Sequence, residues 1–352
     1  MELQSTAPIF IVGCPRSGTT MLRDLLRSHP RLTFPGESHL IPEFYRRYGD
    51  PRDQADARRL GAALLEWRWV RRWNLPLEAE SFANCRSFQE VLCRLYEAWA
   101  RQENKPRWGD KTPEYVTDIP LLAKLFPGAR IIHIYRDGRD VARSWVRARY
   151  TPQNIYTAAQ MWKSWVGAGR QGGAALPREM YLELRYEQLL AQPRETMQRV
   201  CEFVAEPFDE AVLRLNPIVQ NWPFLSRLSP SARKPRAVEI VSSNCGKWKT
   251  TMPARDRALF ESVAGDLLQS LGYETEGRTR RITPAERLAW DVHQRIWRAA
   301  VVLTLDPFRR LTWPRLVPTP DRPCHNVPRD GLAGHANGGM NQAAVYDEKA
   351  SR

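Results

Sequence analysis

The stretch 13–20, GCPRSGTT, has the residue types and spacing of a loop that binds a phosphate group. Consecutive backbone N–H groups from Arg16 to Thr20, at the start of a helix, form a nest for an anion. Gly18 lets the backbone approach that anion closely. Hydroxyl groups that add donors come from Ser17, Thr19 and Thr20. By itself, the same pattern also suits a plain strand–helix turn with threonine caps.

One residue is missing from this loop. A nucleotide-hydrolysing loop carries a lysine before its Ser/Thr, which reaches the β- and γ-phosphates. Here that lysine is absent, and Arg16 lies inside the loop instead. The difference disfavours ATP or GTP hydrolysis, although a phosphate-binding-loop kinase stays an alternative that Mg²⁺-dependent activity with ATP would favour.

A second group of polar residues lies in the stretch 135–145, YRDGRDVARSW. Arg136 follows a predicted strand directly, and Ser144 is expected two turns into the next helix. In a doubly wound sheet, ligands bind outside the carboxyl ends of the strands. Both loops are therefore expected to face one crevice and to bind two phosphates. The alternative is a local ion-pair network of Arg136, Asp137 and Asp140 at a helix start.

The elements that must position these residues alternate between strand and helix. Apolar, β-branched runs predict strands at 8–13 and 130–135, and helical spacing predicts helices at 21–28 and after 138. The stretch 179–204 repeats the strand-to-helix order. Residues 52–103 read mostly as helix and form a helical insert at about 50–105 that could cover a cleft. The pattern predicts an α/β fold, a parallel sheet with helices on both faces. It does not reveal the strand order.

The character of the chain changes from about residue 276. A Thr-Pro signal at 283–284 starts a helix, and a basic, proline-broken stretch follows. Tryptophans flanked by arginines within 285–316 are expected either to pack on the main domain, which we favour, or to lie on a membrane surface. They are Trp290, Trp297 and Trp313. The segment 276–318 is therefore expected to be a C-terminal extension, and 319–352 a disordered tail.

Charge and cysteine usage narrow the class of protein. The 352 residues include 53 Lys+Arg and 39 Asp+Glu, a net charge of +14, which fits polyanions, anionic membranes or anionic small molecules. A nucleic-acid-binding protein is an alternative, but zinc-finger spacing, an RNA-binding aromatic signature and a long basic run are absent, so we expect no nucleic acid. The six cysteines are scattered without ligand spacing, so we expect free thiols and no metal site. Without a signal peptide or an apolar run of about 18 residues, we expect a cytoplasmic protein, at most peripheral to a membrane.

The pair GCPRSGTT and YRDGRDVARSW resembles the sulfotransferases that use 3′-phosphoadenosine 5′-phosphosulfate (PAPS). Further matches follow in the family's order: GDKTP at 109–113, RYEQLLAQP at 185–193 and GKWK at 246–249. The resemblance spans about residues 8–275, so it implies a P-loop-like sulfotransferase domain at 1–275. It also implies that the first loop binds the 5′-phosphosulfate, and that Arg136 and Ser144 bind the 3′-phosphate.

Within the family, the chain is most similar to the tyrosylprotein-sulfotransferase-like branch and its bacterial relatives. The resemblance implies that Arg16, Glu37 and Lys111 form the active site, that Tyr186 contacts the nucleotide, and that Lys247 lies near its phosphates. The animal enzymes have an arginine, a candidate peptide contact, where this chain has His39. The acceptor hydroxyl therefore stays open among sugar, lipid, phenol and tyrosine.

The expected chemistry is in-line sulfuryl transfer without a metal. Arg16, the loop N–H groups and Lys111 would stabilise charge on the leaving phosphate, and Glu37 would take the acceptor proton as general base. The alternatives are that Glu37 caps the following helix, or that His39 or His29 is the base. Oligomeric state does not follow from the sequence.

Overall fold

The computed structural model describes residues 7–148, 152–215 and 243–305. The chain divides into two units, Met1–Pro318 and Thr319–Arg352, and the second lies outside the described residues. The predictions for the tail 319–352 and for Trp313 therefore lie outside them as well.

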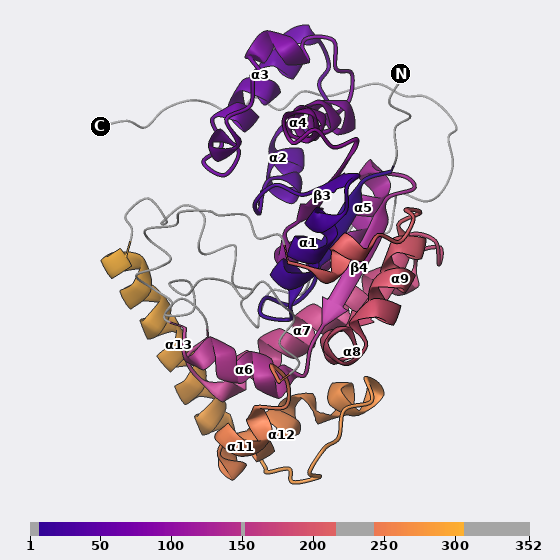
Figure 1. Cartoon of the computed structure of the whole chain (residues 1–352). Helices are drawn as coiled ribbons and strands as arrows, with labels where there is room; N and C mark the ends of the chain where they lie inside the picture. Colours follow the sequence, from indigo (N-terminus) through magenta and orange to yellow (C-terminus); the bar gives the residue numbers. More distant parts are fainter. Residues whose placement is uncertain (1–6, 149–151, 216–242, 306–352) are drawn as a thin grey trace, which may run out of the picture. The chain divides into compact units, whose positions relative to one another are not determined.

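The described part of the chain contains one five-stranded sheet with the order β2-β3-β1-β4-β5. Its strands are β1 (Ile9–Val12), β2 (Leu32–Thr33), β3 (Arg107–Lys111), β4 (Arg130–Tyr135) and β5 (Tyr181–Arg185). Every neighbouring pair is parallel, with Ile11 beside Lys111 and Val12 beside His133. The predicted α/β fold with a parallel sheet is confirmed (Figure 1).

Helices and short 3₁₀ turns connect the strands. The α-helices are α1 (Thr19–Ser28), α2 (Ile41–Tyr48), α3 (Gln54–Leu65), α4 (Phe88–Gln102), α5 (Ile119–Leu125), α6 (Gly138–Val146), α7 (Ile155–Ala174), α8 (Tyr186–Ala191), α9 (Pro193–Phe203), α11 (Trp248–Thr251), α12 (Ala254–Ser270) and α13 (Pro284–Leu305). The 3₁₀ turns are η1 (Arg71–Trp73), η2 (Ala79–Phe82), η3 (Pro113–Thr117) and η4 (Glu210–Leu213).

Both faces of the sheet are covered by helices. On one face, Phe10 and Val12 belong to an apolar core with side chains of α4, α5, α7 and α12. On the other face, Ile9 and Ile11 pack with side chains of α1, α8 and α9. Because both faces of the sheet are buried, the sequence of β1 is a continuous apolar run rather than an alternation of apolar and polar residues. This arrangement confirms the predicted placement of helices on both faces.

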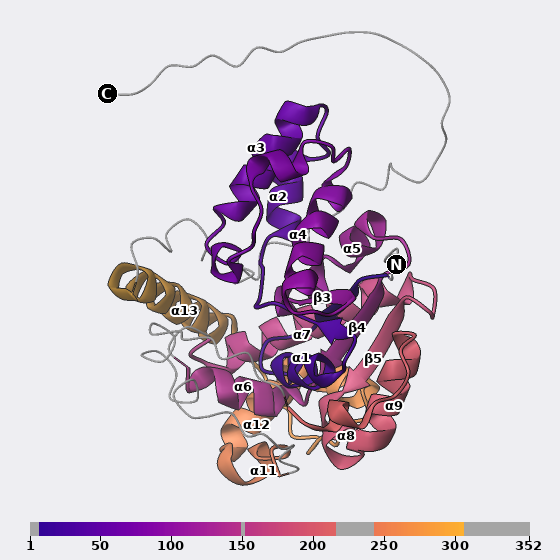
Figure 2. The same ribbon diagram turned by 45° about the horizontal axis from the view of Figure 1, so that its top comes forward.

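The predicted helical insert consists of α3 and α4, with η1 and η2 between them. Asp53 caps α3 by accepting a hydrogen bond from the Asp56 N–H, and Ser87 caps α4 by accepting one from the Glu90 N–H. Such side-chain caps satisfy backbone donors that a helix start leaves unpaired. In Figures 1 and 2, α2, α3 and α4 lie together at one end of the sheet, and α11 and α12 lie at the other.

Strand β3 was not predicted as a strand, because its sequence RWGDK has no apolar run. All five residues are nevertheless buried, since β3 lies between β1 and β2. Its charged ends are paired: Arg107 contacts Glu206, and Lys111 contacts Glu37. Ion pairs with other segments therefore allow a strand to be buried although its sequence lacks the usual apolar run.

The C-terminal helix α13 packs on α7 in the described structure. The rings of Trp290 and Tyr156 stack with centroids 4.8 Å apart, and Gln294 Oε1 accepts a hydrogen bond from the Gln153 N–H at 3.1 Å. These contacts support the packing interpretation for this part of the extension. Exposed apolar side chains on the same helix are Leu288, Val292 and Ile296. A membrane-surface role for 285–316 stays a prediction, and no helix in the described residues has the length and apolar character to cross a bilayer.

Candidate active site

The candidate residues lie where the five strands end. The loop 13–18 follows β1, Glu37 follows the short β2, Lys111 is the last residue of β3, Arg136 follows β4, and Tyr186 follows β5. Because all five strands are parallel, their carboxyl ends share one edge of the sheet. The structure therefore collects side chains from five separate segments at that edge.

The loop after β1 is held by backbone contacts and by Tyr186. The Gly13 N–H donates to the Pro113 carbonyl at 3.1 Å, and the Ser17 N–H donates to the Cys14 carbonyl at 3.1 Å. Gly18 has φ +97°, and a Cβ at this position would lie 2.3 Å from the Tyr186 ring. The loop therefore requires glycine here both for its backbone conformation and for the close approach of the ring.

Arg16 joins this loop to the second motif. It has φ +75°, and its exposed side chain donates a hydrogen bond from Nε to the Ser144 hydroxyl at 3.0 Å. Ser144 lies on α6, which starts just after Arg136. The two stretches that the sequence singled out therefore border one continuous polar site.

Arg136 is buried and packs against Tyr186. Its guanidinium carbon lies 4.6 Å from the centre of the Tyr186 ring, and its Nη2 donates to the Asn244 carbonyl at 2.7 Å. The same nitrogen lies 3.2 Å from Asp140 Oδ2, so the local ion-pair interpretation holds in part. Asp137 pairs instead with Arg139, at 2.8 Å.

The segment from Asn244 to Trp248 closes this cluster. Asn244 Nδ2 donates to the Tyr186 hydroxyl at 2.9 Å, and Lys247 Nζ donates to Asn244 Oδ1 at 2.9 Å. The Trp248 N–H donates to Asp140 Oδ1 at 2.9 Å. Asp140 thus holds both Arg136 and this segment in place. The sequence indicates the GKWK motif at 246–249. The role of Asn244 is visible only in the structure, through its contact with Tyr186.

A second group of charged side chains surrounds Lys111. Its Nζ donates to Glu37 Oε1 and, at 3.3 Å, to the Thr20 hydroxyl of the first loop. The Lys111 side chain is 2% exposed, whereas that of Glu37 keeps 32% of its surface accessible. Burial lowers the pKa of Lys111, and the Glu37 carboxylate opposes that effect. Burial alone would raise the pKa of Glu37, but Lys111 and His39 together hold it well below its ordinary value.

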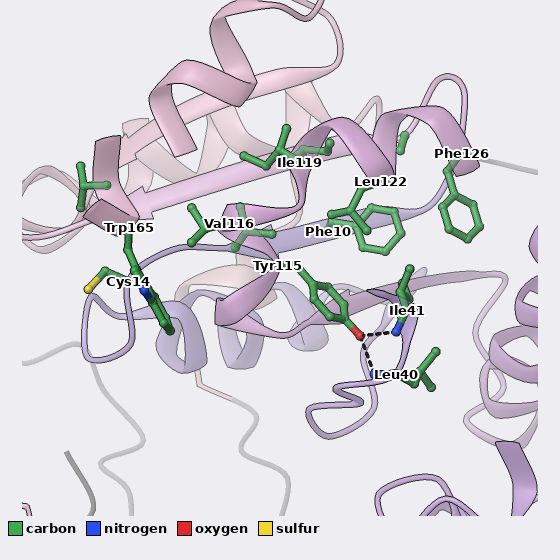
Figure 3. Close-up of a cluster of buried hydrophobic side chains, with 14 of the residues drawn as sticks. Phe10, Cys14, Leu40, Ile41, Tyr115, Val116, Ile119, Leu122, Phe126 and Trp165 are labelled. Atoms are coloured by element: carbon green, nitrogen blue, oxygen red, sulfur yellow. Dashed lines mark hydrogen bonds between the residues drawn. The ribbon is translucent and has the colours of Figure 1, made fainter. Parts of the chain in front are cut away.

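The segment that carries Glu37 is anchored to β3 and η3. The Ser38 hydroxyl donates to Asp110 Oδ2 at 2.6 Å. The Tyr115 hydroxyl accepts hydrogen bonds from the Leu40 N–H at 2.8 Å and the Ile41 N–H at 3.0 Å, as Figure 3 shows. Helix α2 starts with Leu40 as its N-cap. The alternative that Glu37 caps this helix is therefore wrong, because its carboxylate is engaged by Lys111.

The two histidines proposed as alternative bases occupy different environments. His39 Nε2 lies 3.2 Å from Glu37 Oε2, and its Nδ1 lies 3.5 Å from Glu114 Oε2. Burial alone would lower the pKa of His39, but Glu114 and Glu37 outweigh it and raise the pKa above its ordinary value. His29 ends α1, where its Nδ1 accepts from the Arg31 N–H at 3.2 Å and its Nε2 contacts the Pro207 carbonyl at 2.9 Å. His29 is buried, and both of its ring nitrogens contact backbone atoms.

The residues of this edge suit a ligand that carries two separate anionic groups. Buried polar atoms without a hydrogen-bond partner among the described residues include the Ser17 hydroxyl in the loop and Nε of Arg136. Near Glu37 they also include His39 Nδ1, Glu114 Oε2 and Asp110 Oδ1. Unpaired buried donors are uncommon and fit a site that a ligand completes. Among the described residues, no three His, Cys, Asp or Glu side chains gather in a way that could hold a metal ion.

A family model and several known proteins match this chain. A model of the sulfotransferase family matches residues 8–210, more than half of the chain. "Protein-tyrosine sulfotransferase A" of Caenorhabditis elegans is 25% identical over 320 residues, which cover 86% of this chain and 79% of that protein. The nodulation protein NoeE of Sinorhizobium fredii is 28% identical, over 75% of this chain and 65% of that protein.

Solved sulfotransferase structures share this fold. The sulfotransferase domain of the Synechococcus PCC 7002 olefin synthase is similar with a TM-score of 0.52 and 24% identity, over 77% of this chain and 97% of that domain. The five-stranded parallel sheet, the loop after β1 and the family match at 8–210 agree with one another. The chain therefore belongs to the sulfotransferase family.

Proposed function

We propose that this protein transfers a sulfuryl group from PAPS to the hydroxyl of an acceptor. Family membership supports sulfuryl transfer in general. The observation that carries the finer proposal is the position of Lys111: its Nζ contacts both the Glu37 carboxylate and Thr20 of the anion-binding loop. A cation and a candidate base thus lie directly beside the loop suited to the donor's sulfate end.

The donor would be held by groups from both motifs. We assign the 5′ end to the backbone N–H groups of 16–20 at the start of α1, with the unpaired Ser17 hydroxyl as a further donor. We assign the 3′-phosphate to Arg136, Ser144 and Lys247, and the nucleotide to the Tyr186 side chain. When bound, PAPS supplies an activated sulfuryl group on a phosphate leaving group.

The protein's own residues would align the reactants and manage charge. Lys111 and Arg16 would stabilise negative charge on the leaving phosphate, the same task that cations perform in phosphoryl transfer. Glu37 would take the proton of the acceptor hydroxyl. Its pKa is held below the ordinary value, which keeps Glu37 ionised at neutral pH but also makes it a weaker base than an unpaired carboxylate.

The known relatives suggest candidate acceptors for this protein without selecting one. Relatives are named as protein-tyrosine sulfotransferases, which makes peptidyl tyrosine one candidate. Sugars, lipids and phenols remain candidates because this chain has His39 two residues after the glutamate. Residues 67–73, WRWVRRW, approach the same region, since the Trp69 ring lies 4.8 Å from the His39 ring.

The donor can be tested before the acceptor is known. The desulfated product of PAPS, 3′-phosphoadenosine 5′-phosphate (PAP), should raise the melting temperature of the protein without added metal, because it binds the native state. A rise with ATP and Mg²⁺ but none with PAP would favour the kinase alternative. Isotope-labelled PAPS and an acceptor panel, read by mass spectrometry, would then identify the acceptor from the transferred sulfate.

A further inference from the structure

We propose that Glu114 is a positioning residue for the candidate base: it holds the His39 imidazolium between two carboxylates, so that His39 donates to Glu37 and orients it. This inference rests on the proposed function, because it assigns Glu37 the task of taking the acceptor proton. None of the sequence motifs pointed to Glu114.

The geometry is a chain of three side chains from two segments. His39 Nε2 lies 3.2 Å from Glu37 Oε2. On the opposite side of the ring, Nδ1 lies 3.5 Å from Glu114 Oε2, an ion-pair distance at which neither atom makes a hydrogen bond among the described residues. Glu37 and His39 come from the connection between β2 and α2, and Glu114 comes from the first turn of η3 after β3. The His39 side chain is 10% exposed, so its charge depends on these carboxylates rather than on water.

The ring is fixed by its surroundings. His39 has φ +50°, a conformation that a non-glycine residue keeps only where neighbouring contacts impose it. Those contacts are present, because Ser38 is tied to Asp110 and the Leu40 N–H to Tyr115. The Trp69 ring packs against the imidazole with an interplanar angle of 44°. The backbone therefore presents the imidazole to both carboxylates.

When both carboxylates are ionised, only the protonated ring can present an N–H to each of them. Burial and the Glu37 charge raise the pKa of Glu114, and the His39 charge opposes that effect. Imidazolium has two N–H donors, whereas neutral imidazole has one donor and one acceptor. After deprotonation, either Glu37 or Glu114 would face a bare nitrogen. Glu114 therefore acts through His39: its charge keeps the second N–H in place, which leaves Nε2–H for Glu37. The acceptor's proton goes to the Glu37 carboxylate, and the acceptor oxygen keeps the electron pair that forms its bond to sulfur.

Other charged groups near His39 also influence how strongly its imidazolium form is favoured. On β3, Asp110 favours the imidazolium together with Glu37 and Glu114. Arg68 and Arg72 lie 5.0 Å and 5.5 Å from the centre of the Trp69 ring, which packs against His39, so they bring positive charge near the imidazole. Lys111 adds a cation beyond Glu37. Removing one of the three carboxylates should therefore lower the pKa of His39 measurably, since a carboxylate at this distance changes a pKa by about 1–3 units.

The first measurement needs no acceptor and no turnover. NMR of histidine-labelled protein would follow the titration of His39 in wild type, Glu114→Gln, Glu114→Asp and Glu103→Gln. Glu103 is a matched control, with 29% exposure against 26% for Glu114 and an arginine partner of its own. We expect Glu114→Gln to lower the His39 midpoint by about one pH unit or more, Glu114→Asp to restore part of it, and the control to leave it unchanged. An unchanged midpoint in Glu114→Gln would overturn the proposal.

The second measurement separates positioning from stability. With PAPS as donor and water as acceptor, sulfate release would be measured from pH 5.5 to 9.5. We expect the alkaline limb of kcat to move to lower pH in Glu114→Gln by the same interval as the NMR midpoint, with PAP affinity by calorimetry unchanged. A profile that keeps its shape would overturn the proposal. If the wild-type protein binds PAP but releases no sulfate, the His39 titration alone tests the role of Glu114. If the wild-type protein does not bind PAP, the proposed function is wrong, and the titration still tests the contact between Glu114 and His39.

Discussion

The Nε atom of Arg16 donates a hydrogen bond to the Ser144 hydroxyl 3.0 Å away, although 128 positions separate the two residues in the chain. This contact joins the anion-binding loop after β1 to the helix that follows Arg136. If both ends of the donor bind along this edge, the two side chains should contribute jointly rather than independently.

A double-mutant cycle with Arg16→Ala and Ser144→Ala tests that coupling. Each single variant should weaken PAP binding, and the double variant should lose less than the sum, by about 0.5–1.5 kcal/mol, because one hydrogen bond is lost in each. Calorimetric titration of PAP would measure all four proteins. Strict additivity would show that the contact contributes nothing to donor binding.

Arg136→Ala should reduce discrimination for the 3′-phosphate. A charge-assisted contact of this type contributes about 1.5–3 kcal/mol, so the preference for PAP over adenosine 5′-phosphate should fall by that amount. Arg170→Ala is a control, since Arg170 is a partly exposed arginine on α7 that pairs with Glu183. Arg136 would be merely structural if the variant folds and the preference survives.

Gly18→Ala should damage both stability and PAP binding. The added methyl group would lie 2.3 Å from the Tyr186 ring, and φ +97° is strained for alanine. Gly128→Ala separates the two effects, because Gly128 has φ +89° but no atom within 4 Å of the place that its added methyl group would take. Backbone strain alone should cost about 1–2 kcal/mol. Thermal unfolding of both variants should show a larger loss for Gly18→Ala, and equal losses would mean that Tyr186 moves aside freely.

Glu37→Gln should lower turnover by roughly 10²–10⁴ if Glu37 is the general base. The buried ion pair adds a second effect, because the variant leaves Lys111 without its carboxylate and should cost about 1–3 kcal/mol of stability. Adding Lys111→Met should recover stability, since no unpaired buried charge remains, but should not recover turnover. Chemical denaturation and single-turnover kinetics of the folded protein would measure the two separately. Normal turnover in Glu37→Gln would remove its assignment as base.

Stability should depend on pH through His39. Its pKa is raised in the folded protein, because burial is outweighed by Glu114, Glu37 and Asp110. The stabilisation that the charged His39 gives to the folded state is therefore fully present below the pKa of histidine in the unfolded chain, about 6.5. It is lost as the pH rises through the pKa of His39 in the folded protein. The difference in unfolding free energy between wild type and His39→Gln should shrink over that interval. Urea denaturation at several pH values would measure it, and a difference that grows with pH would contradict the raised pKa.

The sequence alone was sufficient for the elements whose signals are local. The strand at 130–135, the glycine loop at 13–20 and the alternation of strand and helix are encoded by neighbouring residues, through β-branching, periodicity and turn chemistry. The parallel sheet with helices on both faces follows from that alternation. The positions of Arg136 and Ser144 at the end of a strand and on the next helix follow in the same way.

Contacts between distant segments were decided only by the tertiary structure. The polar sequence of β3 becomes a buried strand because its backbone pairs with β1 and β2, and its Lys111 is buried because Glu37 neutralises it. His39 lies between Glu37 and Glu114 because Ser38 is bound to Asp110 on β3. Strand order and these charge pairs depend on partners far away in the chain, and no local pattern records which partner a charged side chain will meet.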